Sequence, residues 1–265
     1  MTISALVQRI EIDGQPATAA GLLWPALANP GHFTAMQVRG GKVRGMDLHL
    51  ARLDAATREM FGQPLEGEWV RGLVRHILRD DIEDASVRVH VHAPDGKPSV
   101  MITVRPPTVL AETMEGRAQS LMSVPYQRPF AHIKHLGGFG QAHYGELARR
   151  AGYDGALLTA PDGEISEGAV TNIGFFDGAS VVWPEAPHLS GITMQLVEAG
   201  LPAAGVPTRH ARVTLADLPS YSAAFVTNAW GVCPVRRIDD VAYAVDEKLM
   251  ATVSGVYEEV PLEAF

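Results

Sequence analysis

The sequence predicts a mixed α+β fold, α/β in its first part, that is divided into two domains near residue 110. Its 265 residues suffice for one large domain or two modest ones. Hydrophobic residues make up 46% and charged residues 20%, which is typical of a packed soluble protein and not of a disordered chain. Strand and helix patterns stop at Arg105-Pro106-Pro107 and restart at Gln119. We therefore expect a small N-terminal α/β domain over 1–107, a linker over 108–118 and a larger domain over 119–265.

The expected elements of the first domain follow from periodicity. Alternation of polar and apolar residues, bounded by turn residues such as Asp13-Gly14 and Gly40-Gly41, predicts strands at 7–12, 33–39, 42–44, 87–92 and 100–104. Apolar residues at helical spacing predict helices over 46–61 and about 67–79, with Asp47 as a cap or first-turn acid. The small, apolar stretch 17–27 is expected to form a short helix or a loop.

The same signals recur after residue 119. Strands are expected at 121–124, 155–159, 173–176, 180–183, 223–227 and 235–238. Helices are expected from just after Gly140 to residue 151, and at 193–199, 215–218 and 248–256. The prediction is therefore a second domain that contains more strands than the first.

Charge and composition exclude several classes of function. The formal net charge of −8 argues against a nucleic-acid-binding protein, which should carry a basic surface. The ten histidines are not accompanied by cysteine partners or by a His-Glu-x-x-His motif, so no metal site is expected.

Compartment is predicted from three further features. The single cysteine, Cys233, precludes an internal disulfide framework, and its apolar neighbours indicate a buried structural thiol. No apolar run reaches the roughly 18 residues of a transmembrane helix, and residues 1–14 lack the apolar core of a signal peptide. We expect a cytoplasmic protein without a membrane segment.

Two short stretches carry the chemical signal. Lys134 lies in Ile133-Lys134-His135, close to a Gly-Gly pair, and Glu167 opens Glu-Gly-Ala-Val-Thr-Asn at an expected turn. A lysine that forms an imine and a carboxylate that keeps a pyridine ring protonated are the two groups that a pyridoxal phosphate site needs most. Taken alone, a lysine is usually a solvated surface residue and a carboxylate in a turn is ordinary.

Further motifs give these two residues a context. They are His49-Leu50-Ala51-Arg52-Leu53, Ile133-Lys134, Gly152 to Ala156, Asp162 to Gly168, Thr171-Asn172-Ile173, Ser190 to Thr193 and Pro234-Val235. In order and approximate spacing, the sequence resembles the class IV, or fold type IV, pyridoxal-phosphate-dependent aminotransferases. That family includes branched-chain and D-amino-acid aminotransferases and aminodeoxychorismate lyase. The resemblance covers most of the chain and implies two domains, the larger with a β-barrel-like core.

The resemblance assigns the cofactor, pyridoxal 5'-phosphate, to particular residues. Lys134 would form the imine and later move the substrate proton. Glu167, in preference to the neighbouring Glu164, would pair with the pyridine nitrogen. The phosphate would lie against Arg52, in preference to Arg58, and against two donor loops. The implied loop and neighbouring residues are Thr171, Asn172, Gly191, Ile192, Thr193, Thr227 and Asn228.

Substrate-binding residues are less defined in the sequence. A carboxylate substrate requires an arginine or a cluster of amides. By chain position the candidates are Arg39, Arg105 and Arg128, and each has an ordinary surface or linker role as its alternative. Phe33 with Thr34, and Trp230, are candidates for the pocket wall, with a core position as the alternative for the tryptophan.

Three departures from the family pattern leave the reaction subtype open. Phe139 occupies the position, five residues past the lysine, where many relatives have a tyrosine, and Tyr144 is a candidate substitute. Asn228 replaces a frequent hydroxyl residue and is reminiscent of the lyase branch, and Met194 replaces a frequent arginine.

Three functions therefore remain as hypotheses. The first is an aminotransferase that moves an amino group between an amino acid or amine and a keto acid. The second is an aminodeoxychorismate lyase that releases pyruvate, and the third is a non-catalytic family member. The resemblance also implies a homodimer, the commonest soluble assembly.

Overall fold

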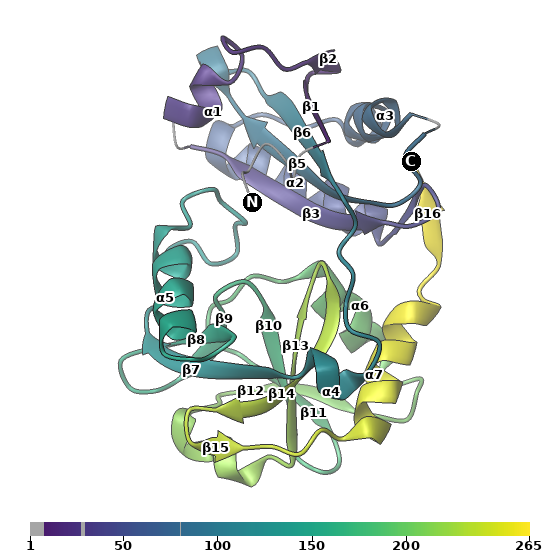
Figure 1. The fold of residues 1–265 in the computed structure, drawn as a ribbon. Coiled ribbons are helices and arrows are strands. Elements are labelled where there is room, and N and C mark those ends of the chain that lie inside the picture. The colour runs from purple at the N-terminus through teal and green to yellow at the C-terminus, as the bar shows by residue number, and fades with distance from the viewer. Residues whose placement is uncertain (1–7, 28–29, 80) are drawn as a thin grey trace. The chain divides into compact units, whose positions relative to one another are not determined.

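The structure, a computed structural model, describes residues 8–27, 30–79 and 81–265 (Figure 1). The chain divides into two compact units, and Leu110 is the first residue of the second. Unit 1 contains the chain up to Val109 together with Ile133–Gly137 and Pro261–Phe265, and unit 2 contains Leu110–His132 and Gly138–Val260. The division expected from the sequence placed those two short segments in the second domain. The two divisions differ because each of these segments is hydrogen-bonded to a strand of unit 1.

Unit 1 is built on a five-stranded antiparallel sheet. Its strands lie in the order β2 (Gln15–Pro16), β1 (Arg9–Ile12), β6 (Ser99–Arg105), β5 (Ala85–His92) and β3 (His32–Val38). The strand expected to begin at Val7 starts outside the described residues. The helices α2 (Met46–Phe61) and α3 (Gly67–Leu78) pack on one face of this sheet, and α1 covers Leu23–Leu27. The elements expected at 46–61, 67–79, 87–92 and 100–104 are therefore present, within a few residues at each end.

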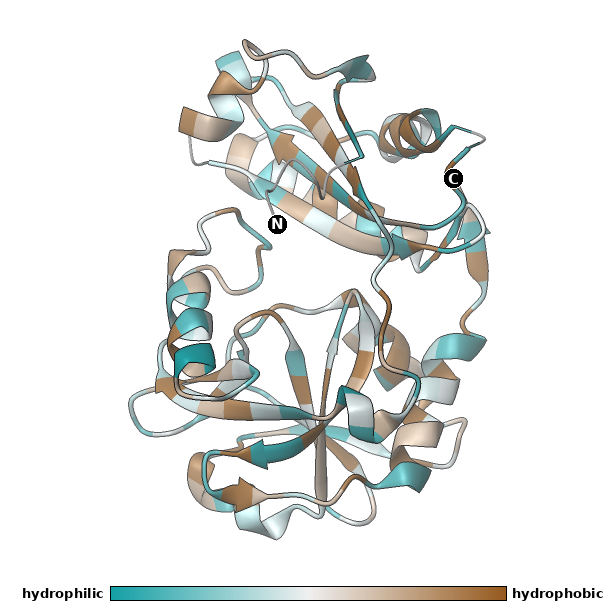
Figure 2. Cartoon of the chain, in the orientation of Figure 1, coloured by the Kyte–Doolittle hydropathy of each residue, from teal (hydrophilic) through white to brown (hydrophobic). Residues whose placement is uncertain are grey.

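The two faces of this sheet differ in character. Side chains alternate along a strand, and one face presents Val87, Val89 and Val91 of β5 to the helices. The opposite face carries the intervening residues, including Arg88 and His90. The strands of unit 1 accordingly show alternating apolar and polar bands (Figure 2). The apolar face builds the core of the unit, and the polar face is left for other contacts.

The segment Ile133–Gly137 extends unit 1 at the edge strand β3. The backbone N–H of Phe33 donates to the carbonyl of Lys134 at 2.9 Å, and the N–H of Leu136 donates to the carbonyl of Gly31 at 2.8 Å. At the other end of the chain, β16 (Leu262–Ala264) pairs antiparallel with β4 (Lys42–Arg44). Backbone pairing to β3 thus determines the position of the lysine segment.

Unit 2 is a curled sheet of nine strands (Figure 1). Its order is β12 (Thr208–Ala211), β11 (Val181–Pro184), β10 (Asn172–Phe176), β13 (Ala223–Asn228), β14 (Gly231–Ile238), β7 (Gln119–Pro125), β8 (Gly155–Thr159) and β9 (Ile165–Gly168), with β15 (Val241–Ala242) beside β14. The curl brings β9, at one end of the order, close to β10 near the other end. This is the barrel-like core that the sequence comparison with a known family implied.

Four helices belong to unit 2: α4 (Met114–Arg117), α5 (Phe139–Arg150), α6 (Ile192–Gly200) and α7 (Glu247–Glu259). α6 and α7 pack together over one apolar cluster that contains the buried rings of Trp183 and Phe225, in edge-to-face contact at 5.4 Å. Cys233 is 7% exposed, as expected for a structural thiol.

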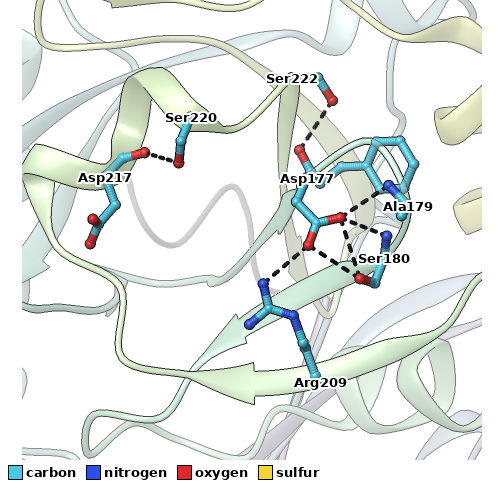
Figure 3. Close-up of polar contacts among 8 residues, drawn as sticks. Asp177, Ala179, Ser180, Arg209, Asp217, Ser220 and Ser222 are labelled. Carbon is cyan, nitrogen blue, oxygen red and sulfur yellow. Dashed lines mark hydrogen bonds and ion pairs between the residues drawn. The ribbon is translucent and has the colours of Figure 1, made fainter.

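A carboxylate fixes the turn between β10 and β11 (Figure 3). Asp177 accepts hydrogen bonds from the backbone N–H groups of Ser180 at 2.8 Å and Ala179 at 3.0 Å, and it pairs with Arg209 of β12 at 3.0 Å. The backbone hydrogen bond from Ser180, with the other donors, lowers the pKa of Asp177 to about 2. The turn and strand β12 are thereby tied together, away from the residues of the candidate site.

Several elements correct the sequence predictions, and the short strands β2, β15 and β16 were not expected. Glu167, expected at a turn, lies within β9, and β12 has no counterpart among the expected strands. Both strands are four residues long and lack alternation of polar and apolar residues: β9 is buried at all four positions, although two of its residues are polar. The expected linker also contains a helical turn, α4, with Thr113 as its N-cap.

Candidate active site

A buried carboxylate is the centre of the candidate site in unit 2. Glu167 is 4% exposed, and its Oε2 accepts a hydrogen bond from the backbone N–H of Leu189 at 3.1 Å. Its Oε1 lies 3.5 Å from Nε of Arg128, whose side chain is 6% exposed and which also donates to the carbonyl of Ala131. Removing two charges from water is costly unless they compensate each other. The arrangement therefore holds a negative charge at a fixed position beneath the surface.

Leu189 connects this carboxylate to the start of α6: its N–H bonds to Glu167 and its carbonyl bonds to Asn172, which lies beside Gly191. Asn172, on β10, donates its Nδ2 to the carbonyl of Leu189 at 2.6 Å, and its Oδ1 occupies the place where a Cβ on Gly191 would lie, 2.1 Å away. Only glycine therefore fits at the N-cap of α6. The hydroxyl of Thr193, in the first turn, donates to the carbonyl of Asn228 at 2.7 Å. The helix begins where the sequence predicted.

Neutral donors gather at this helix start. Thr227 is paired with Asn172 across β10 and β13, and it is 1% exposed. Among the described residues its hydroxyl has no hydrogen-bond partner. A buried hydroxyl without a partner costs free energy unless a ligand satisfies it. Together with the first-turn amides of a nine-residue helix, it forms a donor set suited to a phosphate.

Two turns complete this group in unit 2. The N–H of Gly168 donates to the carbonyl of Thr171 at 2.8 Å, and a Cβ on Gly168 would lie 2.1 Å from the Thr171 hydroxyl oxygen. At the end of β13, Oδ1 of Asn228 accepts a hydrogen bond from the N–H of Trp230 at 2.8 Å. Trp230 itself is 50% exposed. Asn228 is thus committed to shaping its own turn.

Unit 1 holds Lys134 at the edge of its sheet. The lysine Nζ lies 4.9 Å from the centroid of the Phe33 ring, within the range of a cation–π contact. The neighbouring Ile133 is 6% exposed and anchors the segment. Backbone bonds on one side and the Phe33 ring on the other define where the amine lies.

A hydrogen-bonded chain leads to Arg52 in the same unit. The Arg52 guanidinium donates through Nη2 to the hydroxyl of Thr34, whose oxygen lies 2.6 Å from Nδ1 of His49. Burial, and then the charges of Arg52 and Lys134, lower the pKa of His49 well below its usual value, so the imidazole is neutral. Among the described residues Arg52 has no carboxylate partner, and its buried Nε makes no hydrogen bond.

The polar face of the unit 1 sheet carries further positive groups. Phe33 stacks on His90 of the adjacent strand at 5.6 Å, and the Arg88 guanidinium lies 5.6 Å from the same ring. Arg105 faces the same side from β6, and its charge contributes to lowering the pKa of Arg88, after the larger effect of desolvation. The described part of the chain places no carboxylate in an ion pair with Arg88 or Arg105. This face is therefore suited to an anion.

The comparisons with known proteins decide the family. The sequence profile of the family described as Amino-transferase class IV matches residues 31–238, well over half of the chain. The chain belongs to this family. The recognition made from the sequence motifs is confirmed, and with it an enzyme that depends on pyridoxal 5'-phosphate. No curated protein matches the sequence.

Solved structures with this fold include both branches of the class IV aminotransferase family. A branched-chain aminotransferase from Thermoproteus uzoniensis, with norvaline, has a TM-score of 0.80 at 20% identity, covering 95% of this chain and 94% of that one. The 4-amino-4-deoxychorismate lyase from Pseudomonas aeruginosa has a TM-score of 0.79 at 22% identity, covering 95% and 99%. A hypothetical aminotransferase from Mycobacterium tuberculosis in its pyridoxal-phosphate-bound form has a TM-score of 0.80 at 16% identity, covering 94% and 97%. At these identities the likeness shows a shared fold.

The residues present fit the family cofactor in each unit taken by itself. In unit 2 the buried, unpartnered hydroxyl of Thr227 and the glycine-only start of α6 suit a phosphate, and Glu167 supplies a buried carboxylate. In unit 1 Arg52 lacks a carboxylate partner among the described residues. The site residues expected from the sequence divide between the two units. Unit 1 contains Phe33, Arg39, Arg52, Arg105 and Lys134. Unit 2 contains Arg128, Glu167, Thr171, Asn172, Gly191, Ile192, Thr193, Thr227, Asn228 and Trp230.

The structure gives two of the arginine candidates other partners. Arg39 donates to the backbone carbonyls of Val38 and Thr108, both at 2.8 Å, and Arg128 pairs with Glu167. Arg88 and His49 were missed by the sequence reasoning. Arg88 lies in an alternating strand, opposite the valines that face the core, and that signal could have found it. His49 gives no such signal, since a buried histidine on a helix reads as ordinary core.

The aromatic departures from the family pattern lie at the start of α5. Phe139 is 82% exposed and stacks on His143 at 5.7 Å. Tyr144 packs against Tyr126 at 5.3 Å, and that tyrosine ring fills the space beside Gly140. The candidate substitute, Tyr144, therefore belongs to an aromatic cluster of unit 2.

The described residues contain neither a membrane-spanning helix nor a cluster of metal ligands. No helix there is both long and apolar enough to span a membrane. No group of three or more His, Cys, Asp or Glu side chains there is arranged to hold a metal ion.

Proposed function

We propose that this family member transfers amino groups between amino acids and keto acids, with Lys134 as its reactive lysine. Bound pyridoxal phosphate supplies an aldehyde that takes up the amino group and a ring that draws electrons from the substrate carbon. The residues of the chain then bind the cofactor and substrate and move one proton. In this proposal the cofactor-binding residues of unit 1 are Arg52 and Lys134. Those of unit 2 are Glu167, Thr171, Asn172, the Gly191–Thr193 helix start and the Thr227–Asn228 loop.

Lys134 moves the proton at the substrate α-carbon. Its Nζ, released as a neutral amine, accepts that proton. The same amine then delivers the proton to the neighbouring carbon atom on the cofactor side. The Phe33 ring at 4.9 Å and the backbone bonds of its segment restrict where the amine can move. This restriction favours one line of proton transfer.

Glu167 provides the fixed negative charge for the pyridine nitrogen. Its Oε1 lies beside Arg128 and its Oε2 accepts the Leu189 N–H, so the carboxylate does not have to reorganise when a protonated ring nitrogen approaches. Arg128 accordingly acts through Glu167, in place of the substrate role that chain position suggested.

Substrate recognition rests on the polar face of the unit 1 sheet. Arg88 and Arg105 lie there without a carboxylate partner in the described residues, beside Phe33 and His90. Guanidinium groups are preferred for binding carboxylates in two-point contacts. This uncompensated pair of arginines is the observation that carries the proposal of a substrate with a carboxylate, in preference to a simple amine.

A panel of donors tests the proposal. Purified protein loaded with cofactor is mixed with single amino acids and amines, and the absorbance change of each half-reaction is followed. We expect carboxylate-bearing donors to react and their decarboxylated amines to react at least about tenfold more slowly, the value of one charge-assisted contact. The variants Arg88→Met and Arg105→Met should remove this preference, whereas Arg236→Met, at an exposed pair with Asp154, should not. Equal rates for acids and amines would contradict the carboxylate assignment.

A second candidate is a lyase that releases pyruvate from aminodeoxychorismate. It is favoured by Asn228, which stands in a Thr-Asn-Ala loop typical of the lyase branch and is held by the Trp230 amide. Incubation with aminodeoxychorismate and detection of pyruvate separates the two reactions. Pyruvate release without any aminated cofactor from any donor would replace the first proposal with the second.

We also propose a cytoplasmic homodimer. The single buried cysteine suits a reducing compartment. α1 exposes large apolar side chains, with Leu27 82% and Leu23 57% exposed in the isolated chain, and such groups are frequent at subunit interfaces. Size-exclusion chromatography with light scattering tests the assembly, and a mass of one chain, 28.5 kDa, would refute it.

A further inference from the structure

Two buried polar residues, His32 and Thr34, lie on the core-facing side of β3. The strand alternates, and the residues that share this side further along, Met36 and Val38, are apolar members of the core of unit 1. Thr34 is fully buried, at 0% exposure. Valine has nearly the same shape and would avoid placing a hydroxyl in the core, which costs free energy unless its hydrogen bonds are made. The hydroxyl therefore requires an explanation that packing does not provide.

The hydroxyl lies between two polar groups of α2. Arg52 can only donate, so the oxygen of Thr34 accepts its Nη2–H. Thr34 has one proton of its own, and the acceptor in reach is Nδ1 of His49 at 2.6 Å. Burial lowers the pKa of His49, which favours the neutral ring, and its Nδ1 accepts the Thr34 proton in the tautomer that carries the ring proton on Nε2. A fully protonated His49 would reverse this bond and repel Arg52.

The chain of bonds restrains Arg52 at one corner of its guanidinium. Among the described residues Arg52 makes this hydrogen bond alone, and no carboxylate pairs with it. An arginine carries five N–H donors in a rigid fork. Restraining one of them fixes the plane of the group, and the others, with the buried Nε, stay available to an anion.

We infer that Thr34, held in turn by neutral His49, is a positioning residue that orients Arg52 toward the phosphate of the cofactor. This inference rests on the proposed binding of pyridoxal phosphate by Arg52. The Thr34 hydroxyl acts through the arginine, so its loss weakens binding of the phosphate group specifically.

The test compares two probes that differ in that group. Pyridoxal 5'-phosphate and pyridoxal, which lacks the phosphate, are titrated into the cofactor-free protein, and the ratio of their dissociation constants measures the contribution of the phosphate. Thr34→Val should lower this selectivity about tenfold, the usual value of one hydrogen bond to a charged group. Thr34→Ser, which keeps the hydroxyl, should restore it to within about threefold of the original protein.

Thr57 provides the matched control. It is a fully buried threonine whose hydroxyl bonds to His32 and to the Leu53 carbonyl on the same helix, α2, and makes no hydrogen bond to Arg52. Thr57→Val removes a buried hydroxyl from the same unit and should leave the selectivity unchanged. An equal loss in Thr34→Val and Thr57→Val, or no loss in Thr34→Val, would overturn the inference.

His49 supplies a second pair of variants if Thr34→Val does not fold. His49→Asn offers an amide oxygen near the place of Nδ1 and should retain the selectivity, whereas His49→Leu removes the acceptor and should lower it. The opposite order would overturn the inference. Failure of the proposed cofactor role is distinguishable, since the unaltered protein would then bind pyridoxal phosphate no better than pyridoxal.

Discussion

The two units prepare for an anionic cofactor by different physical means. Unit 1 uses long, charged side chains: Arg52 donates to a neutral hydroxyl, and Lys134 and Arg88 both lie at the Phe33 ring. Unit 2 uses short groups and the backbone, where the start of α6, the Thr227 hydroxyl and one buried carboxylate occupy fixed positions.

This difference determines which substitutions each unit tolerates. A charged side chain is positioned by its neighbours, so its position is lost when a neighbour such as Thr34 loses a hydroxyl. A backbone amide is positioned by the fold, so it is lost only when a Cβ appears where none fits, as at Gly191. The predictions below test this contrast, and they run from the largest expected effect to the smallest.

Removing the reactive amine should have the largest effect. Lys134→Ala is expected to lower the rate of amino transfer by about 10³-fold or more, because it removes both the nucleophile and the proton carrier. Single-turnover absorbance kinetics measure this rate, and borohydride trapping followed by mass spectrometry locates the attached cofactor. Lys42→Ala, in β4 of the same unit, is the control and should behave as the unaltered protein. Cofactor attachment at another lysine would contradict the assignment.

Breaking the buried pair in unit 2 should come next. Arg128→Met leaves Glu167 buried beside an apolar group, and the free energy of unfolding should fall by about 3 kcal/mol. The double variant Arg128→Met, Glu167→Met should recover part of that loss, because both charges of the pair are then removed. Urea denaturation of the cofactor-free protein measures both.

An exposed pair provides the comparison for this result. Arg212 and Asp162 lie 2.8 Å apart with side chains 52% and 60% exposed. Arg212→Met should cost less than about 1 kcal/mol. Similar costs for the buried and the exposed pair would show that Arg128 and Glu167 are not held as the structure describes.

Acid should destabilise unit 1 through its buried histidines. Burial lowers the pKa of His32 from 6.5 to about 4, so the folded state binds this proton less readily than the unfolded state. Stability from this group is complete above pH 6.5 and is lost as the pH falls toward 4, by an amount on the order of 3 kcal/mol. Urea denaturation between pH 7 and 4 should show a flatter profile for His32→Gln, whose amide can still donate to Thr57. Parallel profiles would refute the prediction.

A methyl group at the start of α6 should have the smallest effect. Gly191→Ala forces Asn172 to move, because the new Cβ would lie 2.1 Å from its Oδ1, and we expect a cost of roughly 1–3 kcal/mol in unfolding free energy. Gly72→Ala is the control: it lies inside α3 in open space and should stabilise the protein by up to about 1 kcal/mol. Equal effects at the two glycines would show that the helix start is not tightly packed.

Sequence reasoning was most successful where a physical period dominates. The helix at 46–61 and the hairpin strands at 87–92 and 100–104 bury one face each, so their apolar spacing predicts them. Strand β9 was missed because curling of the sheet buries it on both sides, and the alternation of polar and apolar residues disappears.

In the candidate site, too, local features could be predicted from the sequence and contacts between distant residues could not. The start of α6 could be predicted, since glycine before an apolar run is a local signal. The partners of Glu167 and Arg52 could not be predicted, because Arg128 and Thr34 lie in other segments of the chain and contact them only in the folded structure. The roles of these residues with the cofactor stay predictions.

The course of the chain restricts how this enzyme could be recombined with a relative. Unit 1 takes in three stretches of the chain, the second of which, Ile133–Gly137, carries Lys134, the proposed reactive lysine. A chimaera joined once near residue 110 would therefore combine one parent's β3 with the other parent's lysine segment and β16. The hydrogen bonds from Phe33 to Lys134 and from Leu136 to Gly31 would then depend on two sequences that had never been matched. A clean exchange of unit 1 requires four junctions, and the two around residues 133 and 137 determine whether the lysine segment stays with the strand that positions it.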